Sequence, residues 1–417
     1  MDKEGDAVIK IAVISDIHFG VLARSNEFIV PGEIAQDNTE GAASLSEGFI
    51  RYLKEQSVQY LFIPGDLTSK GKPQEFHYCA KKIIETAQKA HIQPENIIWG
   101  TGNHDLDWGI TKLVDDYKDA PDEVREIIND KYRLIAANAA SINMGLLPQN
   151  IKHAGIAPIS GVVERDDFIV FILNSSLYCS HDQKISHGKL DAEQLDWFKK
   201  TAGPYKDDPR WKIILMHHHP YNYAYPVPSF DVSGLEEGSE LQSIAGEAGI
   251  HLVIHGHRHH PRAESVCKSG WKSPITFVCA GSFSVNSNHR SGGEIPNTFH
   301  IIELSDTPGI LKLKNFEYSL AEGWVPFHSN RPTTPLDAEM FFGKIIQEEE
   351  LNKAVLDLIQ TDEDTYQIRW QDVPDELKYS SLDKVNTTIN QLLSAKYCVY
   401  DKFPNDICLL KRKEDYT

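Results

Sequence analysis

The chain has 417 residues, 41% hydrophobic and 24% charged, a composition typical of globular proteins and a length that allows two or three domains. Its net charge of −18 argues against general binding to nucleic acid, which depends on basic surface. No apolar run approaches the roughly 20 residues that span a bilayer, and the charged first residues do not resemble a secretory signal, so we expect a cytoplasmic protein without membrane attachment.

The six cysteines form neither a CxxC pair nor the spacing of a metal site. Most of them lie in apolar surroundings, which predicts buried and reduced thiols. A disulfide from Cys267 to Cys279, or from Cys398 to Cys408, is an alternative that the spacing leaves open.

Three short apolar segments alternate with two amphipathic segments in the first 105 residues. The apolar segments are unbroken hydrophobic runs, as expected of strands buried on both faces of a sheet. This alternation predicts a βαβαβ unit with right-handed crossovers. The expected strands begin at Val8, Tyr60 and Asn96, and the expected helices cover Ser44–Gln56 and Gln74–Ala90.

Similar apolar runs return further along the chain and predict a larger sheet core. The segment 107–155 is helical and acidic in composition, and we interpret it as an insertion over the functional site. Three late strands are expected to close the core as a second sheet or as its edge. The strands are expected at Phe168–Leu173, Trp211–Met216, Ile250–Ile254, Ile275–Ala280, Phe299–Leu304 and Leu311–Tyr318, with a helix at Asp191–Lys200.

The pattern changes around His328–Pro335, where the composition is typical of a linker. We therefore predict a domain over residues 1–325 and a small α+β domain over 336–417. The second would have helices at 336–360 and 381–396 and a hairpin that turns at Pro404-Asn405, which loosely resembles a winged-helix module. From Ala338 onward 16 acidic residues face 10 basic ones, which favours protein contacts or dimerisation over DNA binding.

Polar side chains of the types found in metal-dependent active sites follow five of the expected strands. They are Asp16, His18, Asp66, Asn103, His104, His217, His257 and His259. Each alone has a simpler explanation, such as a helix cap, a turn or a hydrogen-bonded core histidine. Together they lie where parallel strands end, which is where such sheets bind ligands. Oxygen and imidazole donors without thiolate suit manganese, iron, zinc or magnesium, and the set fits two ions about 3.5–4 Å apart.

The order of these motifs resembles that of the calcineurin-like metallophosphoesterase superfamily. The motifs are DxH (Asp16, His18), GD (Gly65-Asp66), GNHD (Gly102–Asp105), a strand that ends in His217, and GHxH (Gly256–His259). The resemblance covers residues 8–320. It implies an α/β fold: a four-layer αββα sandwich of two mixed β-sheets flanked by helices, here with a small C-terminal α+β appendage.

The resemblance also implies which residues hold each of two divalent metal ions. One ion would be bound by Asp16, His18, Asp66 and His259, and the other by Asp66, Asn103, His217 and His257, with Asp66 as the bridge. A hydroxide that bridges the ions would attack the phosphorus of a small phosphorylated substrate. His104 would contact the phosphate and protonate or stabilise the leaving oxygen, and Asp105 would hold its ring.

The remaining histidines near these motifs are expected to support the site or the fold. They are His218 and His219, which follow His217 directly, and His255, His260 and His300.

The residues within these motifs indicate which branch of the superfamily the chain most resembles. The block Gly65–Gly71 lacks the GDxVDRG form of the Ser/Thr protein phosphatases and the tyrosine ligand of the purple acid phosphatases. With Glu75-Phe76 and Gly188–Trp197 it looks most like the class III cyclic nucleotide phosphodiesterases. The predicted substrate is therefore a phosphodiester, cyclic nucleotides included, or a phosphomonoester.

Two alternatives remain open: a metal-dependent nuclease of the DNA-repair branch, and a scaffold that binds metal without turnover. The acidic charge speaks against the first, and the complete set of ligands and His104 speaks against the second.

The loops that would select the substrate, 19–43, 107–155 and 221–240, match no known pattern. The aromatic run Tyr221–Tyr225 would either stack on a base or sugar or pack its own loop.

Overall fold

The computed structural model describes residues 9–35, 43–106, 160–179, 187–220, 233–268, 270–289, 295–328, 336–342, 398–402 and 408–412. The predicted insertion at 107–155, the run Tyr221–Tyr225 and the helix at 381–396 lie outside these residues. The chain divides into two compact units, Met1–Gly309 with Leu313–Glu339, and Ile310–Lys312 with Met340–Thr417.

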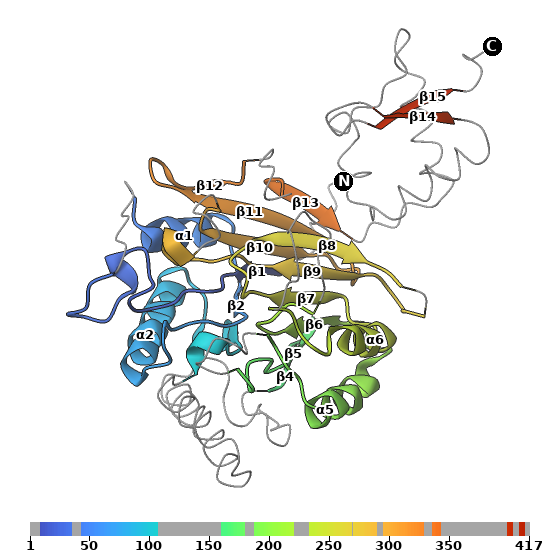
Figure 1. The fold of residues 1–417 in the computed structure, drawn as a ribbon, viewed down its shortest axis with the longest axis horizontal. Coiled ribbons are helices and arrows are strands. Elements are labelled where there is room, and N and C mark those ends of the chain that lie inside the picture. Colours follow the sequence, from blue (N-terminus) through green and yellow to red (C-terminus); the bar gives the residue numbers. More distant parts are fainter. Residues whose placement is uncertain are drawn as a thin grey trace, which may run out of the picture. The chain divides into compact units, whose positions relative to one another are not determined.

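Two mixed β-sheets form the core of the first unit (Figure 1). One sheet contains β1 (Ile9–Val13), β2 (Tyr60–Ile63), β3 (Ile97–Trp99), β10 (Thr298–Leu304), β11 (Leu311–Ser319) and β12 (Gly323–Pro326), in the order β12-β11-β10-β1-β2-β3. The other contains β4 (Gly161–Glu164), β5 (Phe168–Ile172), β6 (Trp211–Leu215), β7 (Leu252–His255), β8 (Arg262–Val266) and β9 (Ile275–Cys279), in the order β4-β5-β6-β7-β9-β8.

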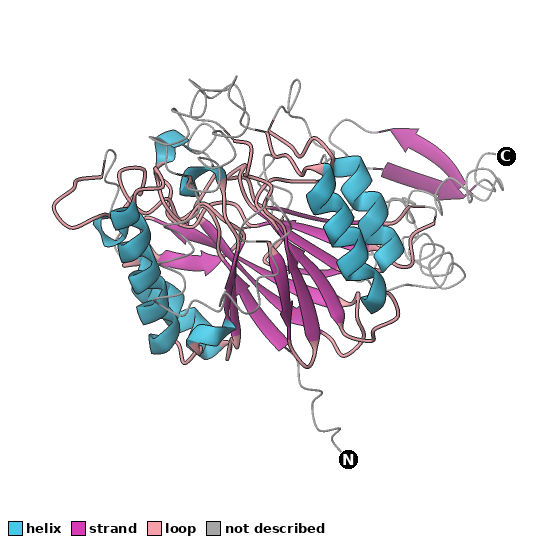
Figure 2. Ribbon diagram, turned by 90° about the horizontal axis from the view of Figure 1, so that it is seen from below, coloured by secondary structure: helices cyan, strands magenta, loops and turns pink. Residues whose placement is uncertain are grey.

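Helices cover the outer faces of both sheets (Figure 2). The helices α1 (Leu45–Glu55) and α2 (Pro73–Lys89) flank the first sheet, and α5 (Ala192–Ala202) and α6 (Gly238–Ala248) flank the second. The predicted four-layer αββα sandwich is therefore confirmed. None of the helices described here combines the length and the apolar character needed to cross a membrane.

Aromatic side chains join the two sheets face to face. The ring of Phe168 on β5 lies 4.9 Å from that of Tyr60 and 5.8 Å from that of Phe62 on β2. Phe62 and Phe168 are fully buried. Burial of each such ring stabilises the fold by about 1.5–3 kcal/mol, so these contacts hold the two sheets together at the core of the unit.

The helices begin and end where the sequence supplies capping groups. The Ser44 side chain accepts from the backbone N–H of Glu47 at the start of α1, and Asp191 does the same for Gln194 at the start of α5. Pro73 occupies the first turn of α2, where a missing N–H costs nothing. Gly249 ends α6 at φ 70°, a left-handed conformation that glycine adopts without strain.

The directions of the strands place the carboxyl ends of several of them at the same edge of each sheet. Strands β1, β2 and β3 are parallel, and so are β5, β6 and β7. The predicted βαβαβ unit is therefore confirmed. The late strands divide between the sheets: β9 pairs with β7, whereas β10 returns to the first sheet and pairs antiparallel with β1.

The C-terminal predictions are partly wrong. The structure has a strand, β13 (Glu339–Phe342), within the segment predicted as a helix at 336–360. Met340 and Phe342 are buried and Glu339 is exposed, which is the alternation of a strand rather than the period of a helix. The predicted hairpin is confirmed as β14 (Cys398–Lys402) and β15 (Cys408–Arg412). The boundary between residues 325 and 336 and the winged-helix resemblance stay predictions.

Neither of the disulfides considered above exists in this fold. Cys267 and Cys279 are free. In the hairpin Cys398 lies opposite Arg412 and Cys408 opposite Lys402, so the two cysteines are too far apart in register to bond.

Candidate metal centre

The candidate ligands lie in loops that leave the carboxyl ends of five strands. Asp16 and His18 follow β1, Asp66 follows β2, Asn103 follows β3, His217 follows β6, and His257 and His259 follow β7. Because these strands are parallel within each sheet and the sheets face each other, their loops meet at one edge. The fold thereby brings together residues as far apart in sequence as Asp16 and His259.

Four of these side chains form a first group. The possible ligand atoms of Asp16, His18, Asp66 and His259 lie within 4.8 Å of one another. His18 Nε2 is 3.4 Å from Asp66 Oδ2 and 3.3 Å from His259 Nε2. His259 Nε2 is in turn 3.1 Å from Asp16 Oδ1. The nitrogen and oxygen atoms therefore converge on a common space.

A second group shares Asp66 with the first. The possible ligand atoms of Asp66, His217 and His257 also lie within 4.8 Å of one another. His217 Nε2 is 3.1 Å from Asp66 Oδ2, and His257 Nδ1 is 3.0 Å from Asn103 Oδ1. Asp66 Oδ2 therefore lies between a histidine of each group, as a bridging carboxylate would.

The backbone at this edge is strained. Five candidate ligands have left-handed φ angles: Asp16 (51°), His18 (48°), Asp66 (53°), His257 (75°) and His259 (54°). Such conformations cost about 1–3 kcal/mol each in non-glycine residues and persist where the surroundings fix them. Here the loops fix one another, since Asp16 N–H donates to the Gly65 carbonyl and His257 N–H donates to Asp16 Oδ2 at 3.1 Å.

Gly102 allows the loop after β3 to approach Asp66. A Cβ at Gly102 would collide with the Asp66 carboxylate and with its backbone nitrogen. Backbone cannot move aside cheaply, so a larger residue must displace the shared carboxylate.

Gly102→Ala is therefore expected to weaken metal binding by at least about tenfold and to destabilise the fold by about 1–3 kcal/mol. Metal content after dialysis and the thermal midpoint measure the two effects. Gly203→Ala is the matched control, because a Cβ there meets nothing within 4 Å. Equal metal content in the Gly102 and Gly203 variants would contradict this account of the loop.

The donor set fits a pair of divalent cations. Asp16 Oδ1 and His217 Nε2 are buried without a hydrogen bond of normal geometry among the described residues. Asp16 Oδ1 lies 3.1 Å from His259 Nε2, and His217 Nε2 lies 3.1 Å from Asp66 Oδ2. Buried lone pairs aimed at a common space suit a shared cation, because uncompensated polar atoms are costly away from water. Nitrogen and oxygen donors of this kind suit divalent manganese, iron, zinc or magnesium.

Asp16 and His18 are in the protonation states that bind metals, whereas His217 is not. Burial would raise the pKa of Asp16, but His18 and His259 outweigh it and hold that pKa well below its usual range. Burial and the neighbouring His104 lower the pKa of His18 to about 4, so the imidazole is neutral. Ionised carboxylate and neutral imidazole are the forms that bind metals. For His217, Asp66 outweighs burial and raises the pKa to about 9, so metal binding there must release a proton.

The contacts of His104 and Asp105 link the loops that carry the candidate ligands. His104 Nδ1 lies 2.9 Å from the Ser69 carbonyl oxygen, and its backbone N–H donates to Asp66 Oδ1 at 2.7 Å. The role predicted for Asp105, which is to hold the His104 ring, stays a prediction. The Asp105 carboxylate accepts from the backbone N–H groups of Thr68 and Gly102, both at 2.9 Å, and so fixes the loops that carry Asp66 and Asn103. Burial and the nearby Asp66 charge raise the pKa of Asp105 to about 7.

The other histidines have partners within the fold. His218 lies 2.9 Å from Ser175 Oγ, and burial holds its pKa well below the usual value. The ring of His219 contacts that of His255, and His300 lies between Asn315 and the Ala280 carbonyl oxygen. His260 accepts from Arg262 Nε at 3.2 Å.

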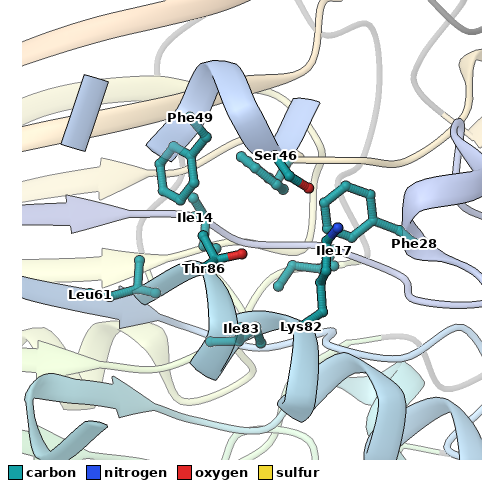
Figure 3. A pocket seen from close by; sticks show the side chains of 10 residues that line it. Ile14, Ile17, Phe28, Ser46, Phe49, Leu61, Lys82, Ile83 and Thr86 are labelled. Carbon is teal, nitrogen blue, oxygen red and sulfur yellow. The ribbon is translucent and has the colours of Figure 1, made fainter. Parts of the chain in front are cut away.

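A small apolar cavity of about 20 Å³ is lined in part by residues that lie close to Asp16 in the sequence (Figure 3). Ile14 and Ile17, on either side of Asp16, form part of its wall, with Phe49 and Phe283. Its volume is that of a single water, and its lining is almost wholly apolar. The cavity is thus a packing gap rather than a place for a phosphate ester.

A family model described as calcineurin-like phosphoesterase matches residues 9–261, more than half of the chain. The chain belongs to this family. As a calcineurin-like phosphoesterase it is a metal-dependent hydrolase of phosphoric esters. The match spans every strand-end loop described above, from Asp16 to His259. No curated protein matches the chain.

Solved structures of other phosphoesterases resemble this one at low sequence identity. A dimetal phosphatase from Danio rerio is 10% identical, with a TM-score of 0.48 over 74% of this chain and 96% of that one. A purple acid phosphatase from yellow lupin (Lupinus luteus) is 13% identical, with a TM-score of 0.48 over 81% and 54%. The NAD nucleotidase of Haemophilus influenzae is 11% identical, with a TM-score of 0.37 over 94% and 68%.

Two residues of this calcineurin-like site were not singled out from the sequence. Ser69 offers the carbonyl oxygen that faces His104, and Ser175 contacts His218. Ser175 belongs to a polar run, Asn174-Ser-Ser176, that follows the buried strand β5. A polar run directly after a buried strand is the same signal that marks the candidate ligands, and it would have identified Ser175.

Proposed function

We propose that the protein hydrolyses a small phosphate ester with two divalent metal ions. One ion would be held by Asp16, His18, Asp66 and His259, and the other by Asp66, Asn103, His217 and His257. The observation that carries this proposal is the position of Asp66 Oδ2, which is 3.4 Å from His18 Nε2 and 3.1 Å from His217 Nε2. A carboxylate oxygen can bridge two ions, which an imidazole nitrogen cannot do.

When bound, such ions polarise the phosphoryl group and lower the pKa of coordinated water. The protein orients the site through the interlocked loops and keeps its carboxylates away from bulk water. Asp16 and Asp66 are at most 1% exposed, so their charge acts at short range with little screening.

His104 is the proposed proton donor to the leaving oxygen. Its Nδ1 faces the Ser69 carbonyl oxygen, which can only accept, so Nδ1 carries a proton. The proton on Nε2 of the charged ring is then the one that His104 would transfer. The Ser69 carbonyl thereby fixes both the ring orientation and the nitrogen that acts.

The proposed substrate is a small phosphodiester, such as a cyclic nucleotide, or a phosphomonoester. The block Gly65–Gly71 and the segment Gly188–Trp197 support the phosphodiesterase branch, as described above. The net charge of −18 supports a small substrate over a nucleic-acid duplex.

Hydrolysis of two chromogenic esters tests this proposal. Metal-free protein reloaded with Mn²⁺ is expected to cleave bis-p-nitrophenyl phosphate at least about tenfold faster than p-nitrophenyl phosphate, and EDTA should abolish both activities. A preference for the monoester would move the assignment to the phosphatases. No cleavage of either ester by protein with two bound ions would contradict the proposed function.

A further inference from the structure

His218 is fully buried beside the candidate metal centre and has no part in the proposed chemistry. Its ring centroid lies 4.3 Å from that of His257 and 5.1 Å from that of His217. The rings of His217 and His257 are themselves 5.1 Å apart. The three imidazoles form a triangle of contacts, and two of its members are the candidate histidine ligands of the second ion.

Ser175, in the loop after β5, fixes the ring of His218. Its Oγ accepts the His218 backbone N–H at 3.1 Å and lies 2.9 Å from His218 Nδ1. Among the residues that the structure describes, Nδ1 is the acceptor available to the hydroxyl proton, so Ser175 donates to Nδ1. The ring N–H is then on Nε2, which faces Cys179 Sγ at 3.7 Å.

Two further contacts prevent the ring from moving away. The backbone of Gly188 packs so closely that a Cβ there would collide with Cβ and Cγ of His218. The Ser175 loop is anchored to α5 by Gln194, which accepts from Asn174 N–H at 2.8 Å and donates to the Asn174 carbonyl at 3.1 Å. Gln194 and Asn174 are fully buried, so the anchor is shielded from competing water.

We propose that Ser175 and His218 are positioning residues for the second metal ion. Ser175 holds the His218 ring, and that ring keeps the imidazoles of His217 and His257 in the orientation that binds the ion. This proposal rests on the ligand assignment given under the proposed function. The histidines of the first ion, His18 and His259, contact each other instead, so the effect is selective for one of the two ions.

Ser175→Ala removes the hydroxyl and leaves all candidate ligands in place. The dissociation constant of the second ion is expected to rise about 10–100-fold, the usual cost of losing a group that orients a ligand. The first ion should keep its affinity within about twofold. Metal-free protein dialysed against graded free Mn²⁺, with bound metal quantified by plasma emission, resolves the two affinities without any activity assay.

Ser176→Ala is the matched control. Ser176 lies in the same loop and is equally buried, but its hydroxyl donates to the Thr101 carbonyl at 3.4 Å. This variant is expected to bind both ions as the unaltered protein does. A second variant, His218→Asn, keeps an acceptor for the Ser175 hydroxyl but lacks the ring. It should also weaken binding of the second ion, and it provides the test if Ser175→Ala fails to fold.

Unchanged affinity for both ions in Ser175→Ala and His218→Asn would overturn the proposal. An equal loss of both ions would overturn it too, because it would show general damage to the site. The unaltered protein separates this result from failure of the proposed function: if it binds no pair of ions, the ligand assignment itself is wrong.

Discussion

Asp66→Asn is expected to lose bound metal and to lower turnover by more than about 10³-fold. Asp66 Oδ2 lies near His18 and His217, one from each group, and an amide in its place removes the shared negative charge. Bound metal ions supply several kcal/mol of transition-state stabilisation, and each 1.36 kcal/mol corresponds to a factor of ten in rate. Metal content per chain and turnover of bis-p-nitrophenyl phosphate measure the two effects.

A buried carboxylate elsewhere in the fold provides the control for this change. Glu317 on β11 is 3% exposed and contacts His328. Glu317→Gln removes a buried charge of the same kind and is expected to retain both ions. Full metal occupancy in Asp66→Asn would show that Asp66 does not bridge the ions.

His104→Ala is expected to keep both ions and to lose about 10²–10⁴-fold in turnover. This is the usual contribution of a positioned acid or base to the rate. His104 itself is not a candidate ligand, and its ring nitrogen Nδ1 faces the Ser69 carbonyl. The separation of turnover from metal content distinguishes a proton donor from a ligand.

His300→Asn controls for the loss of a histidine in this fold. His300 is buried between Asn315 and the Ala280 carbonyl, on β10. The His300→Asn substitution should lower the stability of the fold more than it lowers turnover. A His104→Ala variant that loses its metal, or one that turns over within threefold of the unaltered protein, would exclude the proposed role.

The core of the fold was predictable because buried parallel strands are continuous hydrophobic runs. Strands β5 and β6 and helix α2 agree with the sequence pattern to within one residue at each end. Strand β8 was missed, because its sequence Arg-Ala-Glu-Ser-Val mixes polar and apolar residues at an edge. Helix α6 was missed because its small residues and glycines give only a weak helical pattern.

The candidate ligands were predictable because each lies in the loop that follows a buried strand. The strained φ angles of Asp16 and Asp66 were not, since they arise where the loops after β1 and β2 hydrogen-bond to each other. The contacts of Asp105 were not predictable for the same reason. The Asp105 carboxylate accepts from the backbone N–H groups of Thr68 and Gly102, which lie in different loops.

Anomalous scattering from crystals soaked in Mn²⁺ tests the central claim most directly. Two peaks about 3.5–4 Å apart are expected, one on either side of the Asp66 carboxylate, with the first near His18 and His259 and the second near His217 and His257. A single peak, or peaks away from Asp66, would contradict a two-metal centre bridged by this residue.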